Sequence, residues 1–276
     1  TPVTYSLTDI LTGYTYNANS QLLSSLWTTS AIFGNTYSSW SLGTDYKFMY
    51  GGNAVTGFTN AGTYADITID VLKSGYGAST TSTKGKFQID QKEITSISGV
   101  TASNKVYDAL TTANVDTTNA TLSGMLSGDV VNIASATASF SDKHVGQNKA
   151  VNISTINFGG DAGANYKLAQ NALSGVTANI TKKELTTTGL TAENKIYDGL
   201  DTATIDTTSA TISGKIDGDY LTIDSAQGKF SDKNVDKDKK VGITTVNLSG
   251  VDANNYMVQT NSITGVTADI TKKSVS

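Results

Sequence analysis

Several residue types that carry chemistry are missing from this sequence or nearly so. Its 276 residues include no cysteine, one histidine and one proline, and all 20 basic residues are lysine. Without cysteine there is no disulfide framework, no Cys-ligated metal centre and no thiol nucleophile. Arginine is the usual reader of phosphates and base edges, so an arginine-free chain of net charge -4 is not expected to bind nucleic acid.

Long hydrophobic runs are also missing. No apolar stretch approaches the ~20 residues that cross a bilayer, so membrane insertion is not expected. The first residues, 1–5, lack the basic and apolar regions of a targeting signal. We therefore expect a fragment or a processed segment of a larger chain, and we expect this segment to be monomeric.

The sequence is instead rich in threonine, serine and asparagine, and it keeps 13 Tyr, 7 Phe and 2 Trp. Disordered chains are poor in aromatic and β-branched residues, so this composition indicates a folded protein. Val176, Ala178 and Ile180 alternate with polar residues, as in a strand with one buried face. Threonine is β-branched and polar, which suits the solvent face of a sheet.

An internal repeat of ~90 residues organises the chain. Five short motifs occur twice, at 92–95 and 183–186, 104–108 and 194–198, 140–143 and 230–233, 165–166 and 255–256, and 175–178 and 265–268. We divide the chain into three predicted domains: an N-terminal segment (1–90), a first copy (91–181) and a second copy (182–273). Lys272-Lys273 repeats Lys182-Lys183, so we expect the repeats to continue beyond residue 276.

The predicted elements are short strands joined by turns. Gly-Asp turn signals occur at 127–129, 159–161 and 217–219. The apolar alternation changes phase between 153 and 156 and again between 243 and 246, which predicts a β-bulge in each copy. One helix is predicted, at 19–27, behind an Asn or Ser cap.

Strands of this length and number predict an all-β protein made of three tandem β-sandwiches of immunoglobulin-like size. The junctions between the domains lack the Gly/Ser-rich composition of flexible linkers. An elongated array is therefore expected, with a length on the order of 100 Å at ~3.3 Å per strand residue.

Residues 105–110 and 195–200, with the Asn-Tyr and Ile-Thr-Lys-Lys segments of each copy, resemble the YDG-type repeat domain. The N-terminal segment, with residues 61–64 before a strand, resembles the related MBG-type repeat. Such repeats occur in filamentous-haemagglutinin-like exoproteins and adhesins that Gram-negative bacteria export by two-partner secretion. The resemblance implies a secreted, cell-surface location and no catalytic residue. The first copy departs from the motif, with Ala109 where the second has Gly199.

Few residues are candidates for catalysis or metal binding. His144 has no nucleophile motif with it and is expected in an exposed loop. Asp232, Asp236 and Asp238 offer oxygen ligands for calcium, but interleaved lysines favour a solvated charged loop. We expect no enzyme activity, no cofactor and no metal.

Two recurring motif residues have structural explanations. Tyr107 and Tyr197 are expected to be buried, with the hydroxyl on a carboxylate or a backbone group at a sandwich corner. Lys105 and Lys195 recur beside them, which leaves open an isopeptide crosslink to Asp or Asn. An intact-mass deficit of one ammonia or water for each crosslink is its signature.

Aromatic residues concentrate in the N-terminal segment. Trp27, Tyr37, Trp40 and Tyr46 are candidates for stacking on a glycan, although core packing explains most of the aromatic residues equally well. The predicted function is a rigid stalk of a bacterial surface adhesin, acting in adhesion or biofilm contacts. The alternative is a module in residues 1–90 that binds a glycan or a host protein, with the repeats as spacers.

Overall fold

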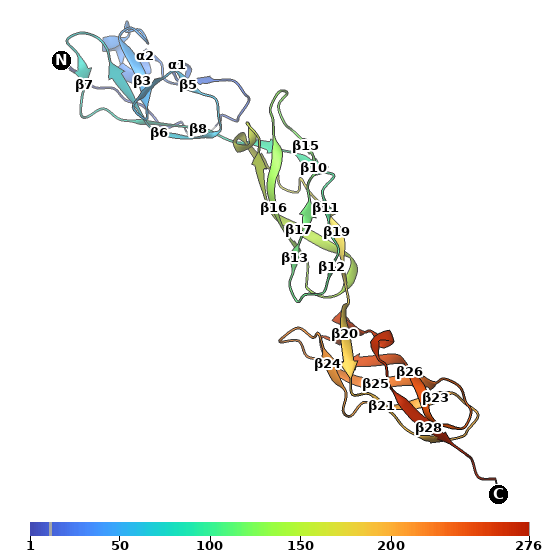
Figure 1. Ribbon diagram of the computed structural model, residues 1–276. Helices are drawn as coiled ribbons and strands as arrows, with labels where there is room; N and C mark the ends of the chain where they lie inside the picture. Colours follow the sequence, from blue (N-terminus) through green and yellow to red (C-terminus); the bar gives the residue numbers. More distant parts are fainter. Residues whose placement is uncertain (11–12, 276) are drawn as a thin grey trace. The chain divides into compact units, whose positions relative to one another are not determined.

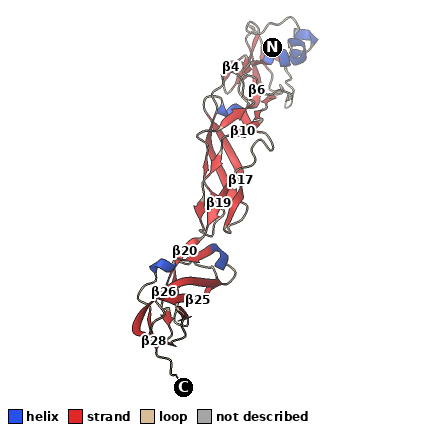
Figure 2. Ribbon diagram, turned by 90° about the vertical axis from the view of Figure 1, so that its right-hand side faces the viewer, coloured by secondary structure: helices blue, strands red, loops and turns tan. Residues whose placement is uncertain are grey.

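The computed structural model describes residues 1–10 and 13–275, and most of its regular structure is β-strand (Figure 2). Its two α-helices are short, and the repeats contain only 3-10 turns within the described residues. The protein is therefore all-β, as predicted.

The chain forms two compact units, which are described separately. Unit 1 contains Thr1–Val100, Asp116–Thr137 and Ile153–Ser174, and unit 2 contains Thr101–Val115, Ala138–Asn152 and Gly175–Ser276. The first copy thus contributes to both units. The division into three domains stays a prediction.

In unit 1, the N-terminal segment is built on a four-stranded antiparallel sheet (Figure 1). Its strand order is β4 (Asn53–Val55), β3 (Tyr46–Tyr50), β6 (Gly62–Val71) and β8 (Gly85–Ile89). Burial alternates along β8, where the first, third and fifth residues are buried and the others are partly exposed. The sheet therefore covers a core on one face, as a period-2 pattern requires.

The helical part of this segment differs from the sequence prediction. The helix predicted at 19–27 is present only as α1 (Leu23–Leu26), because Gln21 and Leu22 form strand β2 against β5 (Gly57–Phe58). The predicted Asn or Ser cap is wrong, since the N-cap is Leu22 and makes no side-chain bond. A second helix, α2 (Thr29–Phe33), was not predicted. Its cap is Thr28, whose Oγ1 accepts from the amide of Ala31 at 3.3 Å.

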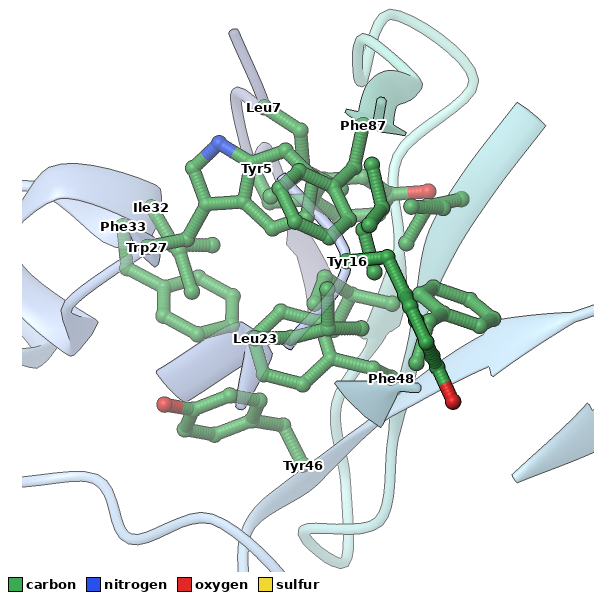
Figure 3. Packing of buried hydrophobic residues seen from close by; sticks show 14 of the residues in the cluster. Tyr5, Leu7, Tyr16, Leu23, Trp27, Ile32, Phe33, Tyr46, Phe48 and Phe87 are labelled. Atoms are coloured by element: carbon green, nitrogen blue, oxygen red, sulfur yellow. The ribbon is translucent and has the colours of Figure 1, made fainter. Parts of the chain in front are cut away.

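Aromatic rings fill the core of the N-terminal segment. Figure 3 shows Trp27, Phe33, Tyr46 and Phe48 packed around Leu23, which is fully buried. The indole nitrogen of Trp27 donates to the carbonyl oxygen of Thr8 at 3.1 Å, so its polar atom is satisfied. Gly85 lies under this ring, and a Cβ atom there would stand 2.9 Å from the indole. Only glycine allows the strand to approach so closely.

The N-terminal segment also contains the parallel pair of β1 (Pro2–Val3) and β7 (Gly77–Ala78), and the first copy contributes further strands to unit 1. Strand β9 (Lys92–Ile94) pairs in parallel with β18 (Tyr166–Leu168), and β10 (Ser96–Ser98) pairs antiparallel with β15 (Thr121–Ser123). Only two residues separate β9 from β8, so the chain passes almost directly from the N-terminal segment into the first copy.

In unit 2, the second copy has a six-stranded sheet and a three-stranded sheet (Figure 1). The larger sheet has the order β21 (Thr191–Ala192), β23 (Thr202–Asp206), β25 (Thr222–Phe230), β26 (Asp236–Ser249), β28 (Thr267–Thr271) and β22 (Lys195–Ile196). The smaller sheet has the order β24 (Thr211–Ser213), β20 (Lys183–Thr188) and β27 (Tyr256–Val258).

The predicted bulge of the second copy is confirmed. Gln227 pairs with Thr245 and the next residue, Gly228, pairs with Ile243, so β26 carries one extra residue there. In the first copy, strand β17 (Gly146–Gly159) has the same break in its burial pattern, because Ser154 and Thr155 are both exposed.

The first copy contributes its own strands to unit 2. Strand β12 (Lys105–Val106) pairs in parallel with β19 (Thr177–Thr181), and β19 pairs antiparallel with β17. Strand β13 (Thr112–Ala113) pairs antiparallel with β16 (Asn132–Phe140). The turns predicted from Gly-Asp signals are also present, with Gly128, Gly160 and Gly218 all at positive φ.

Candidate functional site: the ends of the repeat copies

A recurring turn lies at one end of each copy, directly after β12 and β22. In the first copy, Lys105 Nζ lies 2.7 Å from Asp108 Oδ1 and donates to the carbonyl oxygens of Leu110 and Thr112 at 2.7 and 3.0 Å. Asp108 Oδ1 also accepts from the amide of Leu110 at 2.9 Å. The lysine and the aspartate thus close the turn from both sides.

The second copy repeats these contacts. Lys195 Nζ lies 2.8 Å from Asp198 Oδ1 and donates to the carbonyl oxygens of Leu200 and Thr202. In both copies the lysine nitrogen also lies over a phenylalanine ring, at 5.5 Å from the Phe140 centroid in the first copy. Three acceptors satisfy the three donors of an ammonium group. In each copy the lysine nitrogen is therefore fully engaged by one carboxylate and two carbonyl oxygens.

The residue after the aspartate is left-handed in both copies. Ala109 has a φ of 64° and Gly199 a φ of 83°. Glycine adopts this conformation without penalty, whereas an L-residue with a Cβ atom does not. The departure from the motif in the first copy is therefore accommodated as backbone strain at Ala109, and the turn itself is retained.

The turn in the first copy presents Tyr107 to the second copy. Tyr107 is buried, and its ring meets the edge of the Tyr256 ring with centroids 5.4 Å apart and planes at 76°. The predicted burial of Tyr107 is confirmed, but its hydroxyl has no hydrogen-bond partner among the described residues, contrary to the prediction. The reason is that a residue of the next copy covers it.

Tyr256 makes the polar contacts at this contact surface. Its hydroxyl donates to Asp219 Oδ2 at 2.6 Å and accepts from the amide of Ile216 at 3.1 Å. The Asp219 side chain is only 5% exposed, and Lys143 Nζ of the first copy lies 3.8 Å from its other oxygen. A buried carboxylate needs such donors, because burial without them is costly.

Asn255 supplies a second contact between the copies. Its Oδ1 accepts from the amide of Val145 at 3.1 Å, and its Nδ2 lies 3.4 Å from His144 Nδ1. The chain crosses here through β19 and β20, which are separated by Lys182 alone. His144 is exposed, as predicted, and it also lies at this contact.

Burial and the neighbouring carboxylate change the titration of the tyrosines. Burial and the hydrogen bond to Asp219 raise the pKa of Tyr256 to about 12. Burial and the proximity of Asp219 raise the pKa of Tyr107 well above its ordinary value. Both side chains are therefore neutral at physiological pH, and they act in packing and hydrogen bonding.

The same constellation occurs in unit 1, between the N-terminal segment and the first copy. Tyr16 meets the edge of Tyr166 with centroids 5.6 Å apart, and the Tyr166 hydroxyl donates to Asp129 Oδ2 at 2.6 Å. Asn165 Oδ1 accepts from the amide of Ala61 at 2.8 Å. We call this set of a projecting tyrosine, an amide donor and a receiving Asn-Tyr-Asp group a joint; the chain contains one in each unit.

Sequence reasoning missed most residues of the joints. It named Tyr107 and noted that the pairs Asn165-Tyr166 and Asn255-Tyr256 recur, but it assigned no partner to either pair. Asp129 and Asp219 were noted only as turn residues. The signal available was their fixed spacing, since the aspartate precedes the tyrosine by 37 residues in both copies.

The four candidate glycan-binding residues lie in the aromatic core or at its edge. Trp27, Trp40 and Tyr46 are buried, at 2, 7 and 2% exposure, so their ring faces pack against other side chains. Tyr37 is partly buried and meets Trp40, with centroids 4.7 Å apart. The exposed aromatic surface here comes from Tyr76, which is 40% exposed and which the sequence did not single out.

The acidic residues of the second copy are not gathered into a metal site. Asp232 Oδ1 pairs with Lys239 Nζ at 2.8 Å, and Asp238 donates its amide to Asp269 Oδ1. Among residues 1–10 and 13–275 no group of three His, Cys, Asp or Glu side chains is placed to hold an ion. In the same part of the chain, no helix has the length and hydropathy of a membrane span.

The folded chain is thus an all-β protein. Within each unit, one joint connects neighbouring segments of the chain: the N-terminal segment to the first copy in unit 1, and the first copy to the second in unit 2. The sequence profile of the YDG domain matches residues 90–173 and 181–263, which together are more than half of the chain. The chain belongs to the YDG domain family. Neither the curated proteins nor the solved structures contain a match to it.

Proposed function

We propose that the chain is a stiff structural segment of a secreted bacterial adhesin, in which tandem β-sandwich domains are locked to one another by the joints. The observation that carries the proposal is that the two joints use the same side-chain set. An accidental contact has no reason to recur with the same tyrosine pair, asparagine and aspartate. Fixing a joint also loses less conformational entropy when few residues lie between the strands that it connects.

The cellular context is a further part of the proposal. We extend the expected adhesin setting to this chain, including export by two-partner secretion and an MBG-type N-terminal segment. The abundance of Thr, Ser and Asn supports it, because polar side chains on exposed strand faces avoid large apolar patches. In this role the segment holds a binding region away from the cell or contributes to contacts between cells.

Small-angle scattering of the full chain tests the stiffness. We expect a single elongated particle with a largest dimension on the order of 100 Å, the length of three strand-built domains in series. The double variant Tyr107→Ser/Asn255→Ala removes one joint and should broaden the distance distribution. Gln227→Ala, at an exposed strand position, is the matched control and should leave the distribution unchanged. A compact particle, or no effect of the double variant, would reject the proposal.

A second candidate function is supported by the exposed ring of Tyr76. Its ring meets Trp40 and Tyr37 at centroid distances of 5.5 and 6.2 Å, and Lys73 Nζ lies 6.0 Å from the Trp40 ring. Aromatic rings beside polar groups are suited to stacking on sugars. A glycan array with the full chain and with Tyr76→Ser separates the candidates: binding that Tyr76→Ser abolishes supports a glycan-binding module, and no binding by either chain rejects it.

A further inference from the structure

The second copy carries at its far end the residues that form a joint at the end of the first copy. Tyr197 and Val235 stand 90 residues after Tyr107 and Val145. In the first copy Tyr107 is 1% exposed beneath Tyr256, and Val145 is partly buried and donates its amide to Asn255. In the second copy Tyr197 is only partly buried and Val235 is 40% exposed. The same surface is therefore present without its cover.

The residues after β28 give an independent indication. In both joints the chain continues into a strand that pairs in parallel with the Asn-Tyr strand, and its third residue, Ile94 or Leu185, is at most 1% exposed. The corresponding residues after the second copy are 273–275, which repeat the pattern of a lysine followed two residues later by an apolar side chain.

We propose that the end of the second copy, formed by Tyr197, Asn234, Val235 and residues 273–275, is a docking surface for the Asn-Tyr face of a further YDG copy. In this complex the incoming tyrosine packs edge-on against Tyr197. The incoming asparagine accepts from the amide of Val235. Residues 273–275 become the first strand of the incoming domain.

Charge also fits this occupant. Lys143 lies 3.8 Å from the buried carboxylate of Asp219, and Lys233 is its counterpart in the second copy. The incoming aspartate therefore has a lysine to face it. A second molecule of this chain is not the occupant, because both of its Asn-Tyr faces, at Tyr166 and Tyr256, are already covered within their own units.

The first test converts the end of the first copy into that of the second. The variant Val106→Ile/His144→Asn/Gly146→Asp/Gln147→Lys places the second copy's residues opposite the existing Asn-Tyr face. Hydrogen exchange at the Val145 amide reports docking, because this amide donates to Asn255. We expect protection within about threefold of the unmodified chain. Loss of more than about tenfold, with Tyr107→Ser as the disrupted reference, overturns the proposal.

The second test appends the missing partner. Residues 182–271 are duplicated after Thr271, which supplies a third copy in the natural register. We expect slow exchange at Val235 and at the strand that begins at Lys272 and Lys273, whereas Val235 in the unmodified chain exchanges rapidly. Fast exchange at Val235, with the central strands of the added copy protected, overturns the proposal. If the added copy is unprotected throughout, the first test decides.

The inference rests on the joint as a docking device and not on secretion or adhesion. Scattering that reveals a flexible chain would reject the stiff-segment function. Retained protection of Val145 in the four-residue variant would still support the docking surface.

Discussion

The rings of Tyr107 and Tyr256 are in contact in the joint of unit 2. Removing the hydroxyl group should have opposite effects on the stability of the protein at these two positions. Tyr256→Phe removes the donor at 2.6 Å from Asp219 and the acceptor for the Ile216 amide. A hydrogen bond to a charged group contributes about 1.5–3 kcal/mol, and the remaining cation at the carboxylate, Lys143, is 3.8 Å away. We therefore expect Tyr256→Phe to lower the free energy of unfolding by about 2–3 kcal/mol.

Tyr107→Phe should not have this cost. Its hydroxyl is buried and, within residues 1–10 and 13–275, lacks a hydrogen-bond partner. A buried unsatisfied polar group costs about 1–3 kcal/mol. Removing the oxygen while keeping the ring preserves the edge-on contact with Tyr256. We expect Tyr107→Phe to be neutral or to stabilise the protein by up to about 1 kcal/mol.

The corresponding tyrosine of unit 1 gives a graded control. The Tyr166 hydroxyl makes the same 2.6 Å bond, but its acceptor Asp129 is only partly buried. Water can replace the lost donor there, so Tyr166→Phe should cost about 1 kcal/mol. The stability lost in Tyr256→Phe should thus exceed that lost in Tyr166→Phe. The hydrogen bonds have the same length, so the difference comes from the burial of the carboxylate.

Urea unfolding followed by far-UV circular dichroism measures these differences, and hydrogen exchange assigns them to a unit. Trp fluorescence alone is not sufficient, because Trp27 and Trp40 both lie in the N-terminal segment. The reasoning is refuted if Tyr256→Phe is as stable as the unmodified chain. It is also refuted if Tyr107→Phe loses as much as Tyr256→Phe, since the Tyr107 hydroxyl would then be bonded to Asp219.

Three further predictions follow from the turns and the titrating groups. Ala109→Gly should stabilise the chain by about 0.5–1 kcal/mol in urea unfolding, because it relieves the left-handed φ. Gly199→Ala should destabilise it by about 1 kcal/mol through φ alone, because no atom of the described residues lies within 4 Å of the added Cβ. Equal effects of the same sign would contradict both expectations. Folding raises the pKa of Tyr166 and of Tyr256 to about 12, so the unfolded chain releases these protons at a lower pH than the folded chain does. The urea concentration at the unfolding midpoint should therefore decrease as the pH rises from about 10 to about 12. The decrease should be less steep in Tyr256→Phe. The nitrogens of Lys105 and Lys195 are engaged in an ion pair and two hydrogen bonds to carbonyl oxygens, so the intact mass should equal that of the uncrosslinked sequence. A deficit of one ammonia or water would show a crosslink.

Features that repeat along the chain were accessible from the sequence. The period-2 pattern indicated the strand class, and the phase change before Val246 located the bulge opposite Gln227 and Gly228. The recurrence of Tyr107 and Tyr197 predicted that both are buried, which is confirmed for Tyr107 and is wrong for Tyr197, whose side chain is only partly buried. These properties depend on neighbouring residues or on a comparison of the two copies, and both are visible in one sequence.

Features that depend on distant partners were not accessible. Nothing near Tyr107 in the sequence points to Tyr256, and the equivalent of Tyr107 in the N-terminal segment, Tyr16, lacks the surrounding motif. The composition did not separate core aromatic residues from exposed ones, so buried Trp27 remained a ligand-binding candidate. Helix α2 was missed because five residues are too few to show a helical period.

The direct passage from β19 into β20 has a mechanical consequence. Tension in the chain passes from the first copy to the second through β19 and β20, which only Lys182 separates, and the case considered is a force directed along β20. Strand β20 is hydrogen-bonded in parallel to β27 over three residue pairs, so such a force shears those bonds together and does not peel them one at a time. Forced unfolding is governed by the unfolding rate, and a ladder loaded in shear must lose several bonds in the same step. Strand β20, which connects the two copies, is thus also the element that resists unfolding of the second copy under tension.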